Sequence, residues 1–359
     1  MSKHIIKHIL SLIPTLLGVT VLVFLFIHLI PGDPALVILG EHATEEGIIS
    51  LQKQLGLDKP LFLNLDALSQ ILKGEANLSE GSKVFFDSQY FRFLGRLLRG
   101  DLGRSIHERT PIINTLKQKF PATLELTIFS MAFAIAIGIP AGIISATRRN
   151  SVFDNLSMMG ALAGVSMPIF WLGLMLIYFF GVILGWLPTY GRLPVDSSLE
   201  TITGLFVLDS IITRNPQALL LVFKHLAMPA IALGTIPMAT IARMTRSSML
   251  EVLHQDYIRT AYAKGLKERV VVTRHALKNA FLPVITIVGM QVGGLLAGAI
   301  MTETVFSWPG MGKWAYDAIL ARDYPVVQAS VMVITIGVAV INLMVDISYT
   351  YLNPQIRYE

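Results

Sequence analysis

The sequence predicts an all-α integral membrane protein with six transmembrane helices. Only 15% of its 359 residues are charged and 53% are hydrophobic, whereas a soluble domain carries about 25% charged residues. The apolar residues also gather into separate runs, several of them long enough for a bilayer, which takes roughly 20 residues per helix. The chain has no cysteine, which excludes disulfides, thiolate nucleophiles and cysteine-ligated metals.

Six apolar segments are candidates for membrane spans, and inside hydrocarbon each must be a helix. The first follows a basic start but is not followed by a small-residue cleavage site, so we interpret it as a retained helix and not as a signal peptide. Three prolines, Pro140, Pro168 and Pro237, are expected to bend their helices. The six segments are 9–30, 122–146, 156–184, 226–242, 281–302 and 326–345.

The distribution of Lys and Arg favours an orientation with both termini in the cytoplasm. The densest basic connection is 243–280, which lies inside in this orientation. The region 31–121 would lie outside; its 11 basic and 11 acidic residues cancel, and segments this long translocate largely regardless of charge. The other cytoplasmic parts are 1–8, 147–155 and the tail 346–359, and the other outside parts are 185–225 and 303–325.

The basic connection 243–280 is much longer than an orientation signal requires. Its apolar residues Leu250, Leu253, Tyr257 and Ala261 recur at helical spacing. An amphipathic, charged helix pair is typical of a docking surface for a cytoplasmic partner. The alternative is that the basic residues only fix the orientation of the chain.

Long stretches of the chain resemble the permease subunits of ABC importers for peptides and nickel. They include "FIHLIPGDP" at 26–34, "GDLGRSI" at 100–106, "TRSSMLEVLHQDYIRTAYAKGL" at 245–266 and "RDYPVVQ" at 322–328. The resemblance covers nearly the whole chain and is most similar to the first permease of bacterial dipeptide transporters. It implies the type I importer permease fold, with a large extracytoplasmic element between the first two helices.

The resemblance also implies partners and a mechanism. The partners are a second permease in a heterodimer, two ATPase subunits that bind ATP and Mg²⁺, and a periplasmic solute-binding protein, assembled in the inner membrane among its lipids. The chain itself would bind no cofactor and no nucleic acid, and would move dipeptides by alternating access. Other cargoes remain open: oligopeptides, nickel, glutathione, haem or antimicrobial peptides. A stand-alone secondary transporter is the rival class, but the sequence shows no internal repeat and no midplane charge cluster.

Permeases of this superfamily carry a cytoplasmic "EAA…G" loop that docks on the ATPase. The matching residues here are Arg259, Thr260, Ala261 and Gly265; the Glu is absent, and the second position is Thr. Small side chains at 261, 263 and 265 would allow close approach, and Gly265 would permit a sharp turn. We therefore predict an ATPase-coupling surface at Arg259, Thr260, Ala261, Ala263, Lys264 and Gly265.

The sequence offers no catalytic or metal site. No G-x-x-x-x-G-K-[ST] phosphate loop is present, and no two histidines have the spacing of a compact ligand set. ATP hydrolysis is therefore expected from the partner subunits and not from this chain.

Three carboxylates lie near the ends of predicted spans: Glu125, Glu303 and Asp346. Such residues are candidates for a gating or pathway role, and anchoring at the membrane interface is the alternative. Gly293 and Gly294 indicate either tight helix packing or a substrate-lining surface. The short run 202–212, with Asp209, is predicted to be interfacial or packed outside the membrane. The stretch 61–99 is predicted to be an extracytoplasmic insertion relative to the family.

The charge asymmetry generates a topology prediction. A reporter fused near residue 80 should report an extracytoplasmic location, and one fused to the C-terminus a cytoplasmic location, because the basic connections stay inside. Paired phosphatase and fluorescent-protein fusions measure both. A cytoplasmic signal near residue 80 would overturn the orientation.

Overall fold

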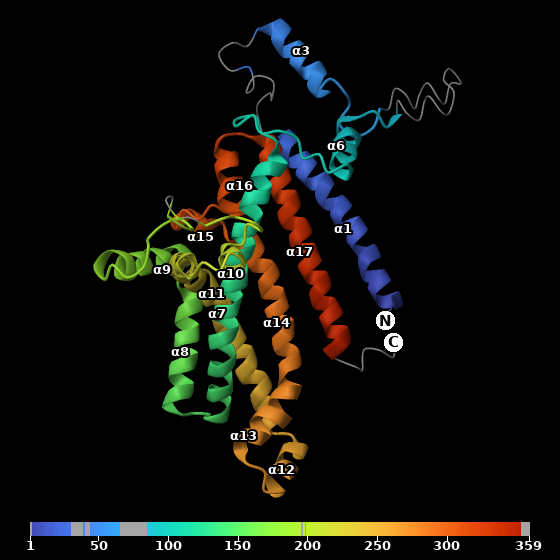
Figure 1. The fold of residues 1–359 in the computed structure, drawn as a ribbon. Helices are drawn as coiled ribbons and strands as arrows, with labels where there is room; N and C mark the ends of the chain where they lie inside the picture. The colour runs from blue at the N-terminus through green and yellow to red at the C-terminus, as the bar shows by residue number, and fades with distance from the viewer. Residues whose placement is uncertain are drawn as a thin grey trace. The chain divides into compact units, whose positions relative to one another are not determined.

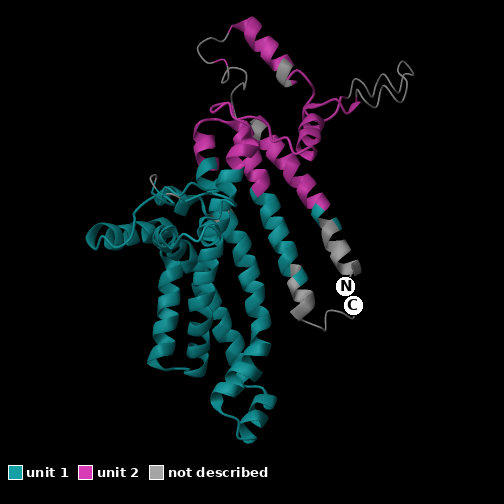
Figure 2. Ribbon diagram, in the orientation of Figure 1, with its two compact units in different colours: residues 1–12, 117–314, 334–359 teal, residues 13–116, 315–333 magenta. Residues whose placement is uncertain are grey.

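The computed structural model of the chain is helical and divides into two compact units (Figure 2). In its described residues no strand occurs beyond one isolated bridge, Arg104 with Pro111. Unit 1 comprises residues 1–12, 117–314 and 334–359, and unit 2 comprises residues 13–116 and 315–333. The structure describes residues 2–29, 39, 44–64, 85–194, 197 and 199–352, so parts of the predicted segments 1–8, 9–30, 31–121 and 346–359 lie outside the described residues.

Four helical stretches among these residues are long and apolar enough to cross a membrane, or up to five if α8 (Val152–Ser166) and α9 (Ile169–Leu176) with η2 (Ile177–Ile183) form one broken span. α1 (Ser2–Leu29) adds a shorter apolar stretch, Leu12–Phe26. The all-α membrane fold is confirmed, and the count of six spans stays a prediction. The four are α7 (Ile112–Thr147), α11 (Pro216–Leu253), the stretch Glu268–Leu296 through α13 (Glu268–Val270), η3 (Val271–Ala276) and α14 (Leu277–Gly298), and α17 (Tyr324–Leu352).

Shorter helices occupy the connections, as Figure 1 shows. None of them has the length of a membrane span. They are α3 (Glu45–Leu55) and α6 (Gln89–Leu98) before α7, α10 (Phe206–Ile212) before α11, α12 (Asp256–Ala263) after it, and α15 (Ile300–Val305) and α16 (Met311–Leu320) before α17.

The helices extend well past the boundaries that hydropathy predicts. The predicted span 226–242 lies inside α11, and 122–146 lies inside α7. The 38 residues of α11 measure about 57 Å at 1.5 Å per residue, nearly twice the roughly 30 Å of hydrocarbon. Hydropathy marks the end of a predicted span at the first polar residues, but the backbone hydrogen bonds of the helix continue beyond them. The predicted connection 243–280 therefore starts within α11.

The predicted span 156–184 is bent at Pro168, as the sequence predicts. α8 ends at Ser166, and the chain turns by 106° before continuing as α9 and η2. Proline lacks a donor and disfavours helical geometry in the residue before it. Met167, just before Pro168, accordingly has an extended backbone (φ −84°, ψ 130°). In contrast, Pro140 and Pro237 lie inside continuous helices.

Glycines on α7 allow it to pack backbone to backbone against α11. A Cβ added at Gly138 would lie 2.7 Å from the carbonyl oxygen of Met238, and one at Gly142 2.6 Å from that of Ala242. No side chain fits at these distances, so each glycine is required by the approach of the helices. The apolar core of unit 1 is built around this contact, with residues of α7, α11 and α14 and with Trp308.

Unit 2 contains an aromatic cluster beside an ion pair network. Phe24 lies 5.4 Å from Tyr90 between ring centroids, edge to face, and the Tyr90 hydroxyl is 2.8 Å from Thr20 Oγ1. Asp87 pairs with both Lys59 and Arg92. The Lys59 ammonium and then the Arg92 guanidinium hold the pKa of the Asp87 carboxyl below its usual value.

Replacing Gly142 by leucine tests the packing of α7 on α11. The variant should unfold more readily by about 1–3 kcal/mol, the usual range for overpacking, although leucine is the better helix former. Thermal unfolding of the detergent-purified chain measures the change. Gly160→Leu on α8 is the matched control, since a Cβ there meets nothing within 4 Å. Equal unfolding temperatures for the two variants would contradict the close contact.

Candidate functional site

The predicted coupling residues lie on α12 and the turn that follows it, at the end of unit 1 that also holds the α7–α8 turn (Figure 1). Asp256 occupies the first turn of α12, where a carboxylate stabilises the positive end of the helix dipole. The amide of Asn279 on α14 donates to the Tyr257 hydroxyl at 2.7 Å. The short helix is thus fixed against the long helix that follows it.

Gly265 ends α12 in the left-handed conformation, with φ at 77°. Its N–H donates to the carbonyl of Tyr262 at 2.9 Å, and the N–H of Leu266 to that of Ala261 at 3.4 Å. Glycine adopts this geometry without the steric cost that a Cβ brings. A Cβ at Gly265 would meet nothing within 4 Å in this chain. The sequence therefore needs glycine here for the turn, and the space beside it is open.

An apolar cluster beneath α12 holds the connection in shape. Ala261 belongs to this cluster and is 7% exposed. Its side chain is thus covered by the chain itself, and its part in the ATPase-coupling surface stays a prediction. The spacing of the small residues does not reveal which face of α12 is covered. The cluster comprises Ala146, Met249, Ile258, Ala261, Val271, Val272, Ala276 and Ala280.

The remaining predicted coupling residues form an exposed basic surface. Arg259, Thr260, Ala263, Lys264 and Gly265 are all exposed. The nearest carboxylate to Arg259 is that of Asp256 at 3.5 Å, in a pair open to solvent on both sides, and such pairs contribute little. The charge is therefore available to an acidic partner. Lys267, Arg269 and Arg274 extend the exposed basic surface.

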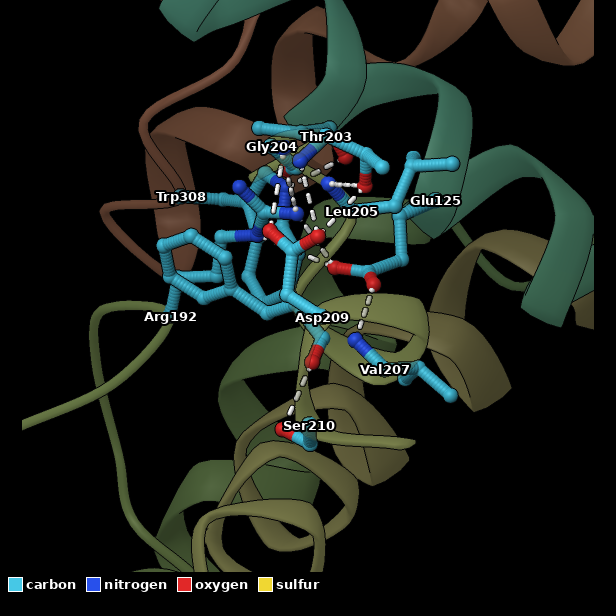
Figure 3. A network of polar contacts seen from close by, with 11 residues as sticks. Glu125, Arg192, Thr203, Gly204, Leu205, Val207, Asp209, Ser210 and Trp308 are labelled. Carbon is cyan, nitrogen blue, oxygen red and sulfur yellow. Dashed lines mark hydrogen bonds and ion pairs between the residues drawn. The ribbon is translucent and has the colours of Figure 1, made fainter. Parts of the chain in front are cut away.

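A second polar site lies at the opposite end of unit 1 (Figure 3). The carboxylate of Glu125 on α7 accepts two bonds from Arg192, at 3.0 Å from Nε and 2.5 Å from Nη2. It also accepts the N–H of Val207, near the start of α10, at 2.7 Å. Both charged side chains are about 95% buried or more. Glu125 thus ties the connection between η2 and α11 to α7 and is not exposed at an interface.

Asp209 completes this network from α10. Its carboxylate accepts the N–H of Thr203 at 2.8 Å, the Thr203 hydroxyl at 2.6 Å, and the N–H of Gly204 at 3.0 Å. The carbonyl of Gly204 in turn accepts from Arg192 Nη2 at 2.7 Å. The segment 202–212 is therefore folded around the carboxylate of Asp209, which is fully buried.

Arg192 is the residue of this network that the sequence analysis does not identify. Its guanidinium stacks over the Phe206 ring at 3.7 Å from the centroid. Burial lowers the pKa of Arg192, and the Glu125 carboxylate opposes this; arginine remains protonated in proteins. Before folding it is one basic residue in a connection of mixed polarity, 67 residues from its partner. No local pattern reports such a distant pair.

Glu303 is fully buried and organises the start of α16. Its carboxylate accepts the Thr123 hydroxyl at 2.5 Å and the N–H of Lys313 at 2.8 Å. Thr123 also accepts the N–H of Met311 at 2.7 Å. A Cβ at Gly310 would collide with the Glu303 carboxylate. Glu303 therefore bonds α16 to α7 and is not an exposed anchor.

The other predicted candidates differ from one another. Gly293 on α14 is buried and faces α17, where an added Cβ would lie 3.5 Å from Val338. Gly294 is exposed, with nothing within 4 Å. Gly293 therefore fits the packing role, whereas Gly294 borders open space. Asp346 lies within α17, but its side chain is outside the described residues. Among those described, no three His, Asp or Glu residues form a group that could hold a metal.

Two family models cover most of the chain. The model of the binding-protein-dependent transport system inner membrane component matches residues 138–358. The chain belongs to this family. The model of the N-terminal part of such membrane components matches residues 1–127. The two matches together account for both the helical core and the first helix with the region after it.

Several relatives match end to end. The dipeptide transport system permease proteins DppB of Alkalihalophilus pseudofirmus and Escherichia coli are 49% and 43% identical, over 100% of each chain. The glutathione transport system permease protein GsiC of Escherichia coli is 40% identical, also over 100% of both chains. The first alignment spans 359 residues, and the insertion expected at 61–99 relative to the family stays a prediction.

A solved structure supports the fold. The MetNI methionine ABC transporter, in an inward-facing conformation, has a chain similar to this one with a TM-score of 0.52. The match covers 68% of this chain and 98% of that chain at 19% identity. The likeness concerns the fold alone, and confirms the permease fold of the type I importers that the sequence predicts.

Removing the cation from the buried pair should destabilise the chain strongly. Arg192→Met leaves the Glu125 carboxylate buried without its partner, at a cost of about 3–5 kcal/mol. Thermal unfolding of the purified chain measures the loss. Adding Glu125→Gln should recover most of it, because the amide is neutral and still accepts the N–H of Val207. Lys224→Met, an exposed site, is the control. Equal effects of Arg192→Met and Lys224→Met would contradict the assignment.

Proposed function

We propose that the chain is a transmembrane permease subunit of an ATP-driven importer that moves dipeptides and related short peptides by alternating access. The observation that carries this is the 43–49% identity to dipeptide permeases over the full length of both chains. A relative from Pseudomonas aeruginosa, 46% identical, is a di/tripeptide permease by name. Glutathione, the cargo in the name of another relative, is itself a tripeptide. All three names support a short-peptide cargo.

The ATPase subunits are proposed to dock on the exposed basic surface of α12 and the turn after it. A surface of small and basic side chains supported by an apolar cluster suits a partner that presents acidic groups. ATP binding and hydrolysis belong to those partners, and the chain contributes the pathway. The helix α11 runs without interruption from Pro216 to Leu253, so a displacement at α12 is transmitted along it to the opposite end of unit 1.

The remaining parts of the proposed assembly follow the family. A second permease completes the pathway, and a solute-binding protein delivers peptide on the outside. Both termini and 243–280 lie in the cytoplasm in this proposal, and the inner membrane is crossed several times. Nucleotide and Mg²⁺ bind to the ATPases only.

Replacing Gly265 by leucine tests the coupling surface. Leucine opposes the left-handed backbone by roughly 1–2 kcal/mol and fills the open space beside the turn. The membrane helices are unchanged, so insertion should be normal, while dipeptide uptake should be lost and co-purification of the ATPases should fall. Uptake of labelled dipeptide and pull-down of the complex from the same cells measure both.

The matched control is Gly185→Leu. Gly185 also has a positive φ, 61°, with nothing within 4 Å of an added Cβ, but it lies after η2, between residues that pack near the start of α11 and not beneath α12. The Gly185→Leu variant therefore has a similar steric cost of placing a Cβ at a positive φ, and it leaves the proposed ATPase surface unchanged. Wild-type uptake and ATPase retention in Gly265→Leu would mean that 243–280 is only an orientation signal.

A further inference from the structure

Another buried carboxylate lies at the end of unit 1 that holds α12. Asp154, in the first turn of α8, is 2% exposed. Arg246 on α11 binds it with two donors, Nε to Oδ1 at 2.7 Å and Nη2 to Oδ2 at 2.9 Å. This two-point geometry fixes orientation as well as distance. The pair therefore sets how α8 sits against α11.

The remaining bonds of Asp154 come from the end of α7 and the turn after it. The Ser145 hydroxyl donates to Oδ1, and the N–H of Asn150 donates to Oδ2 at 3.0 Å. Asn150 has a positive φ of 61°, a conformation that asparagine tolerates better than most residues. One carboxylate thus joins α7, the α7–α8 turn and α11.

Arg246 lies near the start of the connection 243–280, close in sequence to the apolar cluster beneath α12. Met249, three residues further along α11, belongs to the apolar cluster beneath α12. Ala146, the neighbour of Ser145, belongs to the same cluster. The Asp154 network therefore lies next to the apolar cluster that supports α12.

The contacts of α8 with α11 differ at its two ends. Near the end of α8, a Cβ at Gly164 would lie 2.9 Å from Thr235 Cγ2, so the helices touch there through small groups without an ion pair. At the start, the charged pair holds them. Beyond Ser166 the chain turns by 106° into α9, so a rotation of α8 is carried into α9 and η2.

We propose, on the basis of the proposed function, that the Asp154–Arg246 pair positions α8 so that it moves together with the coupling helix. ATPase closure shifts α12 and the end of α11, and Arg246 draws Asp154 and α8 with them. The bent pair α8–α9 then changes its orientation at the opposite end. Asp154 and Arg246 are positioning residues and contact no peptide in this mechanism.

Transport measurements on the assembled complex test the proposal. Asp154→Asn keeps the shape and removes the charge, and Arg246→Lys keeps the charge but loses the two-point geometry. Peptide imported per ATP hydrolysed should fall by about fivefold or more in Asp154→Asn and by less in Arg246→Lys, while ATPase retention and hydrolysis persist. Arg243→Gln, an exposed arginine one turn earlier on α11, should match wild type. Unchanged import per ATP in Asp154→Asn overturns the proposal.

A distance measurement separates this proposal from the function on which it rests. The chain has no cysteine, so Met159→Cys on α8 and Glu251→Cys on α11, both exposed, take spin labels specifically. The complex with its ATPases should give one narrow distance with and without vanadate-trapped ATP. Asp154→Asn should broaden it.

Dipeptide import and the spin-label distance test the proposed cargo and the positioning role separately. If the wild-type complex imports no dipeptide, the proposed cargo is wrong, and the spin-label distances still test the pair. If Asp154→Asn leaves the distance distribution as narrow as in wild type in both states, α8 does not depend on the pair and the positioning role is wrong. Arg243→Gln serves as the control here as well.

Discussion

The structure depends on one constraint: a backbone that crosses hydrocarbon must satisfy its hydrogen bonds within its own helix. The long helices follow from it, and α11 shows the consequence most clearly. Because it continues unbroken past the apolar core to Leu253, the same helix that packs on the Gly138 and Gly142 face of α7 also carries Arg246 and leads into α12. The packing on α7, the buried ion pair and the proposed coupling surface are thus connected by a single helix.

Charges are few in this chain, and the buried ones occupy its junctions. Glu125 with Arg192 ties the η2–α11 connection to α7, and Asp154 with Arg246 ties α8 to α11. A buried ion pair gives little net stability, but losing one partner is costly. Such pairs therefore specify which elements sit together. A protein that alternates between conformations needs some contacts that keep two elements together. It also needs others, such as contacts between small residues, along which helices can shift past each other.

The sequence predicts the helical class, the family and the turn at Gly265 because these depend on local composition and pattern. Hydropathy misplaces the ends of α7 and α11, because it measures how side chains prefer lipid or water, whereas the ends of a helix depend on its backbone hydrogen bonds. Proline chemistry predicts the bend at Pro168 but not its angle of 106°, which packing against the neighbouring helices determines. The partners of Glu125 and Asp154 stand 67 and 92 residues away, and only folding brings them together. For the same reason the sequence does not show that the side chain of Ala261 is covered by the apolar cluster beneath α12.

The central claim is that the exposed face of α12 contacts the ATPases, and a cross-link tests it most directly. A photoreactive maleimide on Ala263→Cys, in a chain with no other cysteine, should capture an ATPase subunit in the assembled complex. The same label on Trp186→Cys, an exposed site after η2 among residues that pack near the start of α11, should capture none. Capture of an ATPase subunit from Trp186→Cys but not from Ala263→Cys would contradict the account.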